Sequence, residues 1–174
     1  ISADIVPMID ENRVLSFYGL QQLNSSPRMG LKALMEVTNR NETFNISNVI
    51  FGLAPRINAA GRIEHGNKAV ELLVQEDYSL AKEQADYIDK HNFTRKELDK
   101  SITQEALAMI VPDSNATVVC SEKWHKGVVG IVASRLIETH YRPTIVLTES
   151  NGKLTGSARS VSGFDVYNAI DACS

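Results

Sequence analysis

The sequence has no long apolar run and no recognisable export signal. No stretch approaches the roughly 18 uninterrupted apolar residues that a membrane-spanning helix requires. The first residues lack the basic segment followed by an apolar one that marks a secretory signal. What is present, 43% apolar and 22% charged residues, is typical of a globular chain and excludes a disordered one. The sequence does not begin with Met and ends inside a predicted helix, so we expect a piece of a longer protein.

Cysteine is scarce as well. The sequence contains two cysteines, Cys120 and Cys173, and neither has a second Cys or a His at the spacing of a zinc site. Their positions exclude a zinc finger and a disulfide framework and predict a reducing, cytoplasmic setting. Cys120 follows an apolar, strand-like run, so we expect a buried thiol there.

Positive charge is not in excess, because the formal net charge is −3. The composition therefore does not indicate a strongly basic nucleic-acid-binding chain. Residues 69–116 carry ten acidic and five basic groups, whereas residues 117–163 carry six basic and three acidic groups. A local basic site on an acidic chain suits a few phosphates better than a long duplex. The alternative is a chance fluctuation among few charges.

The first third of the chain has the pattern of helices interrupted by one unusual segment. Residues 1–8 have the pattern of a strand end that runs into Pro7. Residues 46–66 start apolar and continue with Gly, Pro and Ala at a density that predicts no regular element. Such a segment permits close approach of backbone to a ligand. Helices are expected over 12–23, 31–37 and 67–74, with a loop over 39–45.

A long helix is predicted after these elements. Asp77 is expected to cap it, and Pro112 lies beyond its end, so the helix would span about 50 Å. Helices of this length usually connect domains or form coiled coils. The apolar pattern breaks around 92–96, which favours a connecting helix.

From residue 116 the pattern becomes that of an α/β domain. A strand, a helix and two further strands are expected, followed by a helix capped by Asp165, and Asn151-Gly152 is a hairpin signal. This order predicts a small mixed sheet flanked by helices. The expected strands are 116–120, 144–148 and 154–160, and the first helix is 127–137.

Two arginines and an amide in the Gly/Pro-rich segment are the first candidate binding residues. Arg56, Asn58 and Arg62 lie close together in sequence, and the guanidinium group suits bidentate phosphate recognition. The alternative is a pair of surface arginines that close a loop.

A second candidate pair alternates along a predicted strand. Ser157 and Arg159 are two residues apart, so they project to the same face, and a hydroxyl beside a guanidinium makes an anion site. The alternative is a polar, solvent-facing strand surface.

Trp124, His125 and Lys126 precede a predicted helix whose N-terminal amides attract anions. We expect Trp124 to stack on a base and His125 to donate to a phosphate. The alternative is a Trp that packs at the sheet edge beside a capping His.

Asp4 is a lone carboxylate near a predicted strand end. Such a residue can be a metal ligand, but no other Asp or His nearby supplies the rest of a coordination shell.

Taken together, these segments resemble the RecJ family of single-strand-specific DNA exonucleases in the DHH phosphoesterase superfamily. The similar stretches occur in the family's order and span essentially the whole chain; they are 3–7, 11–13, 54–62, 124–135, 142–146 and 156–160.

The resemblance implies an α/β fold that is the C-terminal part of a two-domain core. Residues 1–45 would end the DHH catalytic domain, residues 46–116 would hold the Arg56–Arg62 loop and long helices, and residues 117–174 would form most of the DHH-associated substrate-binding domain. The family's Asp-His-His signature, its earlier aspartates and its Gly-Gly-His motif are absent from the sequence.

The resemblance also implies roles for the candidate residues. Asp4 matches the last catalytic, metal-ligand aspartate of the DHH motifs. Arg56, Asn58 and Arg62 match a family loop facing the substrate cleft. The pair that holds the 5′ phosphate of the substrate is matched by Ser157 and Arg159, and the segment 124–126 falls in a substrate-contacting stretch.

The activity implied for the parent protein is 5′→3′ hydrolysis of single-stranded DNA in repair and recombination. Two divalent ions, Mn²⁺ or Mg²⁺, would serve as cofactors in the full-length enzyme. Residues 1–174 alone are expected to be catalytically inactive and to bind at most part of this metal pair or none of it, because one carboxylate cannot hold two metals. Single-stranded DNA with a 5′ end would be the substrate partner. By the same resemblance, a single-strand-binding protein and a helicase would be protein partners, and no association with a membrane is expected.

Three other interpretations stay open. The first is a relative in the same superfamily that cleaves oligoribonucleotides or cyclic dinucleotides. The second is a non-catalytic nucleic-acid-binding module, and the third is an α/β domain in which the motifs arise by chance.

Overall fold

The computed structural model describes residues 1, 3, 6–40, 42–63 and 66–173. It divides into two compact units, Ile1–Thr94 and Arg95–Ser174, and the division falls inside one long helix. In the described part of the chain, no helix has the length and apolar character needed to cross a bilayer.

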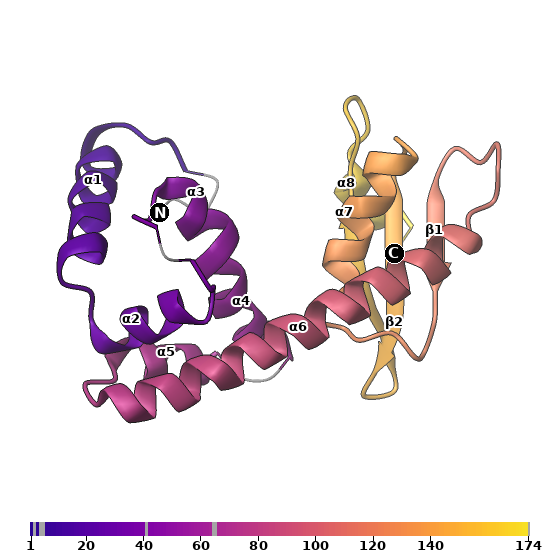
Figure 1. Ribbon diagram of the computed structural model, residues 1–174. Helices are drawn as coiled ribbons and strands as arrows, with labels where there is room; N and C mark the ends of the chain where they lie inside the picture. Colours follow the sequence, from indigo (N-terminus) through magenta and orange to yellow (C-terminus); the bar gives the residue numbers. More distant parts are fainter. Residues whose placement is uncertain (2, 4–5, 41, 64–65, 174) are drawn as a thin grey trace. The chain divides into compact units, whose positions relative to one another are not determined.

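Unit 1 consists of helices packed around one apolar core (Figure 1). Its centre is formed by Leu34, Leu72 and Ile88, each at most 1% exposed. Gly30 permits the tightest contact, because a Cβ there would lie 1.8 Å from the carbonyl oxygen of Leu72. The elements are α1 (Asp10–Ser25), α2 (Met29–Glu36), α3 (Ile46–Asn48), the π-helix η1 (Val49–Leu53), α4 (Ala54–Ile63), α5 (Asn67–Val74) and the first part of α6 (Tyr78–Ala108).

The Gly/Pro-rich segment is helical, so the prediction of an irregular loop over 46–66 is wrong for its described residues. Pro55 follows the π-helix η1 within the continuous helical run 46–63, where its missing N–H leaves one carbonyl of the preceding turn without its helical hydrogen bond. Ala59 and Ala60 are at most 4% exposed, so packing outweighs the low helix propensity of Gly and Pro. The predicted strand end at 1–8 is also absent from the described residues 1, 3 and 6–8.

Unit 2 contains a three-stranded sheet in the order β1-β2-β3 (Figure 1). β1 (Thr117–Cys120) pairs parallel with β2 (Thr144–Ser150), and β2 pairs antiparallel with β3 (Lys153–Arg159). The connection between β2 and β3 is Asn151-Gly152, and both residues have positive φ, 56° and 71°, as the predicted hairpin turn requires. The remaining elements are the second part of α6, α7 (Val129–Thr139) and α8 (Val166–Asp171).

α7 packs on β2 and β3. Val132 and Leu136 on α7 and Val146 on β2 are completely buried. The β2–β3 register places Ser157 opposite Val146 and Arg159 opposite Thr144. Opposite residues share a face of the sheet, so Ser157 and Arg159 lie on the face that α7 covers.

Cys120 corrects a third expectation. Its side chain is exposed, although a buried thiol was predicted. β1 is an edge strand whose residues alternate between buried and exposed, and Cys120 falls in an exposed position of that alternation. The division into 1–45, 46–116 and 117–174 stays a prediction.

Candidate functional site

The guanidinium of Arg159 is the centre of the best-defined polar site in unit 2. Its Nε donates to Ser134 Oγ at 3.0 Å, and its Nη1 donates to Ser157 Oγ at 2.6 Å. Nη1 also donates to the carbonyl of Ala158 at 2.8 Å, and Nη2 donates to the carbonyl of Gly130 at 2.9 Å. The structure therefore brings Ser157 and Arg159 into direct contact, and these bonds fix the orientation of the guanidinium plane.

All four acceptors of Arg159 are neutral. Among the described residues no carboxylate pairs with this guanidinium, which is half-buried. An anion is the group that would complete the site, because hydrogen bonds to charged partners are the stronger ones. One Nη2 hydrogen has no acceptor in this set of bonds, and Ser157 Oγ keeps its own proton to donate.

The first turn of α7 borders this site. Its N-cap, Val128, has no side-chain capping bond, and the Ile131 amide donates to the Val128 carbonyl at 2.8 Å. The amides of Val129 and Gly130 are therefore the ones that an anion could use. A Cβ on Gly130 would lie 3.4 Å from Ser157 Oγ and 3.5 Å from Arg159 Nη2. A glycine at this position therefore leaves space beside both groups.

Two residues of this site, Gly130 and Ser134, were missed by the sequence analysis. They lie on successive turns of the predicted helix, and Ser134 Oγ donates to the Gly130 carbonyl at 3.2 Å. The signal that would have found them is a pair of small residues four apart on a helix that faces the Ser157–Arg159 strand.

His125 contributes to the loop that leads into α7. Its Nδ1 accepts from the Gly127 amide at 3.1 Å. An accepting Nδ1 places the proton of the neutral imidazole on Nε2, where it can be donated. Lys126, the next residue, is exposed. The roles expected for both residues stay predictions.

Trp124 is not placed as expected. The indole is 4% exposed, and its Nε1 donates to Glu105 on α6 at 2.9 Å. Its backbone carbonyl accepts from the buried hydroxyl of Thr148 at 2.6 Å. A ring enclosed in this way offers no face to a base, because stacking requires an exposed π surface. Trp124 anchors the sheet to α6 within unit 2, which corresponds to the packing alternative.

The candidate residues of unit 1 are distributed over two sides of α4. Arg56 donates to Asp89 at 2.7 Å and to the Gly52 carbonyl at 2.8 Å, so it ties α4 to α6. Asn58 and Arg62 are exposed and lie four residues apart, on one face of the helix. A ligand in solvent can reach this exposed face, whereas the side chain of Arg56 is largely enclosed.

Asp4 lies outside the described residues. Within those that are described, no group of three His, Cys, Asp or Glu side chains has the arrangement of a metal site. The residues that the structure describes therefore do not fit the pair of divalent ions that the resemblance implies, and no catalytic step is derived from this chain.

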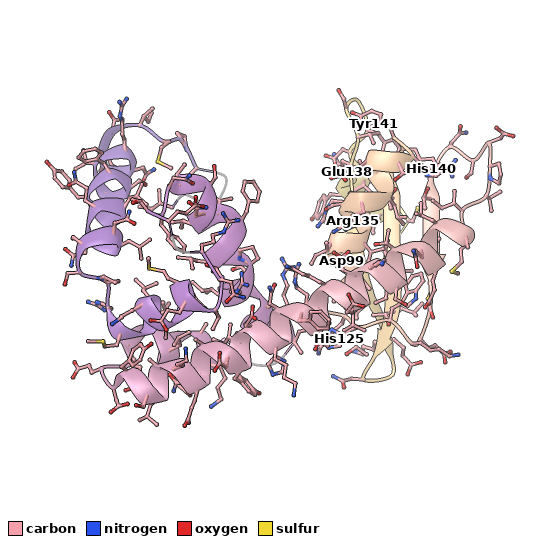
Figure 2. The ribbon with its side chains drawn as sticks, in the orientation of Figure 1. Asp99, His125, Arg135, Glu138, His140 and Tyr141 are labelled. Carbon is pink, nitrogen blue, oxygen red and sulfur yellow. The ribbon has the colours of Figure 1, made fainter. Side chains whose placement is uncertain are left out.

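A second arginine of unit 2 holds a buried carboxylate. Arg135 on α7 donates to Asp99 on α6 at 2.8 Å, and Figure 2 shows the two labelled residues beside each other. Asp99 is 3% exposed. The hydrogen bond to Asp99 raises the pKa of Arg135, so the guanidinium stays charged and compensates the buried carboxylate.

Similar proteins agree with this architecture. Residues 113–174 match the family model described as the DHHA1 domain. The single-stranded-DNA-specific exonuclease RecJ of Bacillus subtilis is 43% identical over 98% of this chain. The RecJ of Escherichia coli is 36% identical over 97% of it. The chain spans 22% of the first of these relatives and 31% of the second.

Solved structures show the same fold. RecJ from Thermus thermophilus in complex with Mn²⁺ superposes with a TM-score of 0.86 at 32% identity, over 98% of this chain and 26% of that structure. Its complex with Mg²⁺ gives a TM-score of 0.87, over 98% of this chain and 27% of that structure. The α/β fold class is thus confirmed. Nearly the whole chain is therefore similar to one region of the RecJ proteins, and residues 113–174 match the DHHA1 domain.

Proposed function

We propose that this chain is the substrate-binding segment of a 5′→3′ single-strand-specific DNA exonuclease, and that Ser157 and Arg159 hold the 5′ phosphate of the strand. The observation that carries the proposal is the half-buried Arg159 guanidinium, which four neutral acceptors orient and no carboxylate of the described residues neutralises. A terminal phosphate would supply the negative charge that balances the Arg159 guanidinium. Gly130 places no side chain beside Ser157 and Arg159, and the amides of Val129 and Gly130 would donate to the phosphate.

The exposed face of α4 is proposed to contact the strand as well. Asn58 and Arg62 would bind the strand directly. Arg56 has part of its donors occupied by Asp89 and Gly52, so its substitution should lower stability together with binding. Arg62 is exposed, so its substitution should lower binding with a smaller effect on stability.

The metals belong to the longer protein in this proposal. Two RecJ structures hold Mn²⁺ or Mg²⁺, and such ions would activate the attacking water and stabilise the leaving oxygen. Asp4 is proposed as one of their ligands. Action in DNA repair and recombination, a cytoplasmic location, and a single-strand-binding protein and a helicase as partners are proposed with the activity.

The binding test uses the chain itself and two oligo(dT) probes, one with a 5′ phosphate and one with a 5′ hydroxyl. We expect the chain to prefer the 5′ phosphate by about tenfold, and Arg159→Ala to remove that preference. Arg159→Lys should keep part of it, because a charge remains without the fork of donors. Lys153→Gln, an exposed change on the β2–β3 hairpin, is the control. An unchanged preference in Arg159→Ala would contradict the phosphate role.

The activity test uses the full reading frame that encodes this chain. With Mn²⁺ and 5′-phosphorylated single-stranded DNA, we expect mononucleotides to be released stepwise from the 5′ end, and more slowly from RNA of the same sequence. Cleavage of short RNA or cyclic dinucleotides without release from DNA would assign the protein to the small-substrate branch of the superfamily. Binding without any cleavage would favour a non-catalytic module.

A further inference from the structure

A groove between α6 and α7 in unit 2 has a cationic lining that the 5′-phosphate site does not use. Its volume is about 500 Å³. Four basic side chains line it, together with two acidic ones, one of which is the buried Asp99. The basic residues are Arg95, Lys96 and Lys100 on α6 and Arg135 on α7.

Two of these cations have no partner in the described part of the chain. Lys96 and Lys100 are exposed, and in the ranges 6–40, 42–63 and 66–173 no ion pair joins either ammonium group to a carboxylate. By contrast, Lys82 pairs with Glu36 at 3.3 Å, and Lys68 pairs with Glu71 at 2.9 Å. Lys96 and Lys100 therefore differ from these two lysines of unit 1, whose charges are compensated.

The spacing of the two lysines adds to this contrast. Residues four apart on a helix are neighbours, and like charges at that spacing destabilise a helix by a few tenths of a kcal/mol. The segment 69–116 has twice as many acidic as basic groups, yet its basic groups concentrate at this groove. Glu97 and Asp99, three residues from Lys100 and Lys96 respectively, offset part of this repulsion, and an external anion with several charges would offset the rest.

The groove and the Arg159 site border the same turn of α7. Ser134 accepts from Arg159, and the adjacent residue, Arg135, pairs with Asp99 in the groove. Consecutive residues point about 100° apart around a helix, so a strand that reaches both sites would pass around α7. We propose that the α6–α7 groove binds internal phosphates of the same single strand whose 5′ phosphate Arg159 holds, with Lys96 and Lys100 as the contacting cations.

This inference rests on the proposed function and extends it to a second binding region. A series of separated cations fits a series of phosphates, whereas one inorganic phosphate would engage only part of the groove. The cationic side chains give no sequence preference, because contacts to phosphates do not read bases. The groove would therefore add affinity in proportion to strand length.

The test measures binding of oligo(dT) of about 4 and about 16 nucleotides, lengths that bracket common single-strand sites. Lys96→Gln/Lys100→Gln should weaken binding of the longer probe about threefold to tenfold and leave the shorter probe unchanged. The salt dependence for the longer probe should fall by about 0.7 in log–log slope for each lysine removed. Glu97→Gln, which removes an acidic group from the groove lining, should strengthen binding.

Controls separate the two proposals and the kind of ligand. Lys153→Gln should change neither probe. If Arg159→Ala loses the 5′-phosphate preference while the lysine variant binds both probes like the wild type, the groove proposal is overturned and the function stands. If the lysine variant loses length-dependent affinity while Arg159→Ala behaves like the wild type, the groove stands and the 5′-phosphate role fails. Displacement of the longer probe by polyglutamate as effectively as by oligo(dT), or by inorganic phosphate alone, would overturn the strand as its ligand.

Discussion

Each of the two units joins a helix to α6 with an arginine–aspartate pair, and the two pairs are built in opposite ways. In unit 1 the side chain of Arg56 is 14% exposed and that of Asp89 is 37% exposed. In unit 2 the side chain of Arg135 is 53% exposed and that of Asp99 is 4% exposed. The buried partner is the cation in one unit and the anion in the other.

This difference in burial predicts how much stability each unit loses when the more exposed partner of its pair is removed. Removing one partner of a buried pair leaves the other charge uncompensated, and this costs more than the pair contributes. Arg56 keeps its bonds to the carbonyls of Gly52 and Val37 when Asp89 is removed. Among the described residues, Asp99 keeps a 3.5 Å contact from Thr103 Oγ1 and no other side-chain hydrogen bond when Arg135 is removed. Unit 2 should therefore be the more sensitive one.

The largest expected effect is that of Arg135→Ala. It should destabilise unit 2 by about 3 kcal/mol, because Asp99 would stay buried without its guanidinium. The measurement is urea unfolding followed by the fluorescence of the single tryptophan, which lies in unit 2. Arg135→Ala combined with Asp99→Asn should recover part of the loss. If the urea midpoint of the tryptophan transition were the same in Arg135→Ala and the wild type, unit 2 would not be more sensitive than unit 1 to the loss of its ion pair.

Asp89→Ala should have a smaller effect, about 1 kcal/mol on unit 1, because this carboxylate is partly solvated and Arg56 keeps other acceptors. Far-UV circular dichroism reports the helices of unit 1, and the tryptophan signal serves as the internal control for unit 2. If Asp89→Ala destabilised its unit more than Arg135→Ala does, burial would not be the property that decides the cost.

Gly130→Ala should separate binding from stability. Alanine is the better helix former by about 0.5–1 kcal/mol, and the added Cβ would meet Ser157 Oγ at 3.4 Å and Arg159 Nη2 at 3.5 Å. We expect unit 2 to become slightly more stable and its preference for a 5′ phosphate to fall. Both are measured on one sample, by urea unfolding and by probe binding. Unchanged binding would show that the space beside Gly130 is not used.

The smallest effect concerns Glu36 in unit 1, which accepts hydrogen bonds from Tyr78 and Lys82. The bond from Tyr78 lowers the pKa of Glu36 below its usual value of 4.5. A lowered folded-state pKa means that the contribution is present above about pH 4.5 and is lost as the pH falls through the folded value. When the pH is lowered from about 7 to about 3, the free energy of unfolding of Glu36→Gln should therefore fall by a few tenths of a kcal/mol less than that of the wild type. Equal losses would contradict this.

Features decided by local chemistry could be predicted from the sequence. The Asn151-Gly152 turn and the caps at Asp77 and Asp165 were predicted from residue type, and all three are present. Features decided by packing could not be predicted in this way. α4 is a helix because it is buried against its neighbours, and Trp124 is enclosed by a partner 19 positions away, Glu105.

The pattern of α6 shows the limit most clearly. Its apolar positions were interpreted as interrupted around 92–96, yet Asn92 and Asp99 are 2% and 3% exposed and continue the buried stripe. A polar residue at a buried position cannot be distinguished from an exposed one until its partner is known. In the candidate site, likewise, the Ser157–Arg159 pair followed from strand alternation, whereas Gly130 and Ser134 required the contact between α7 and β3.

The sheet of unit 2 also has a consequence for the order of folding. β2 and β3 are joined by two residues, so this hairpin can form within microseconds. β1 pairs with β2 across a long intervening segment that contains α7, so we expect this pairing to form after the hairpin. Arg142 bonds to Val111, Ser114 and Thr117 at the entry to β1. These contacts therefore belong to the late stage of folding, and Arg142→Ala should speed unfolding far more than it slows folding.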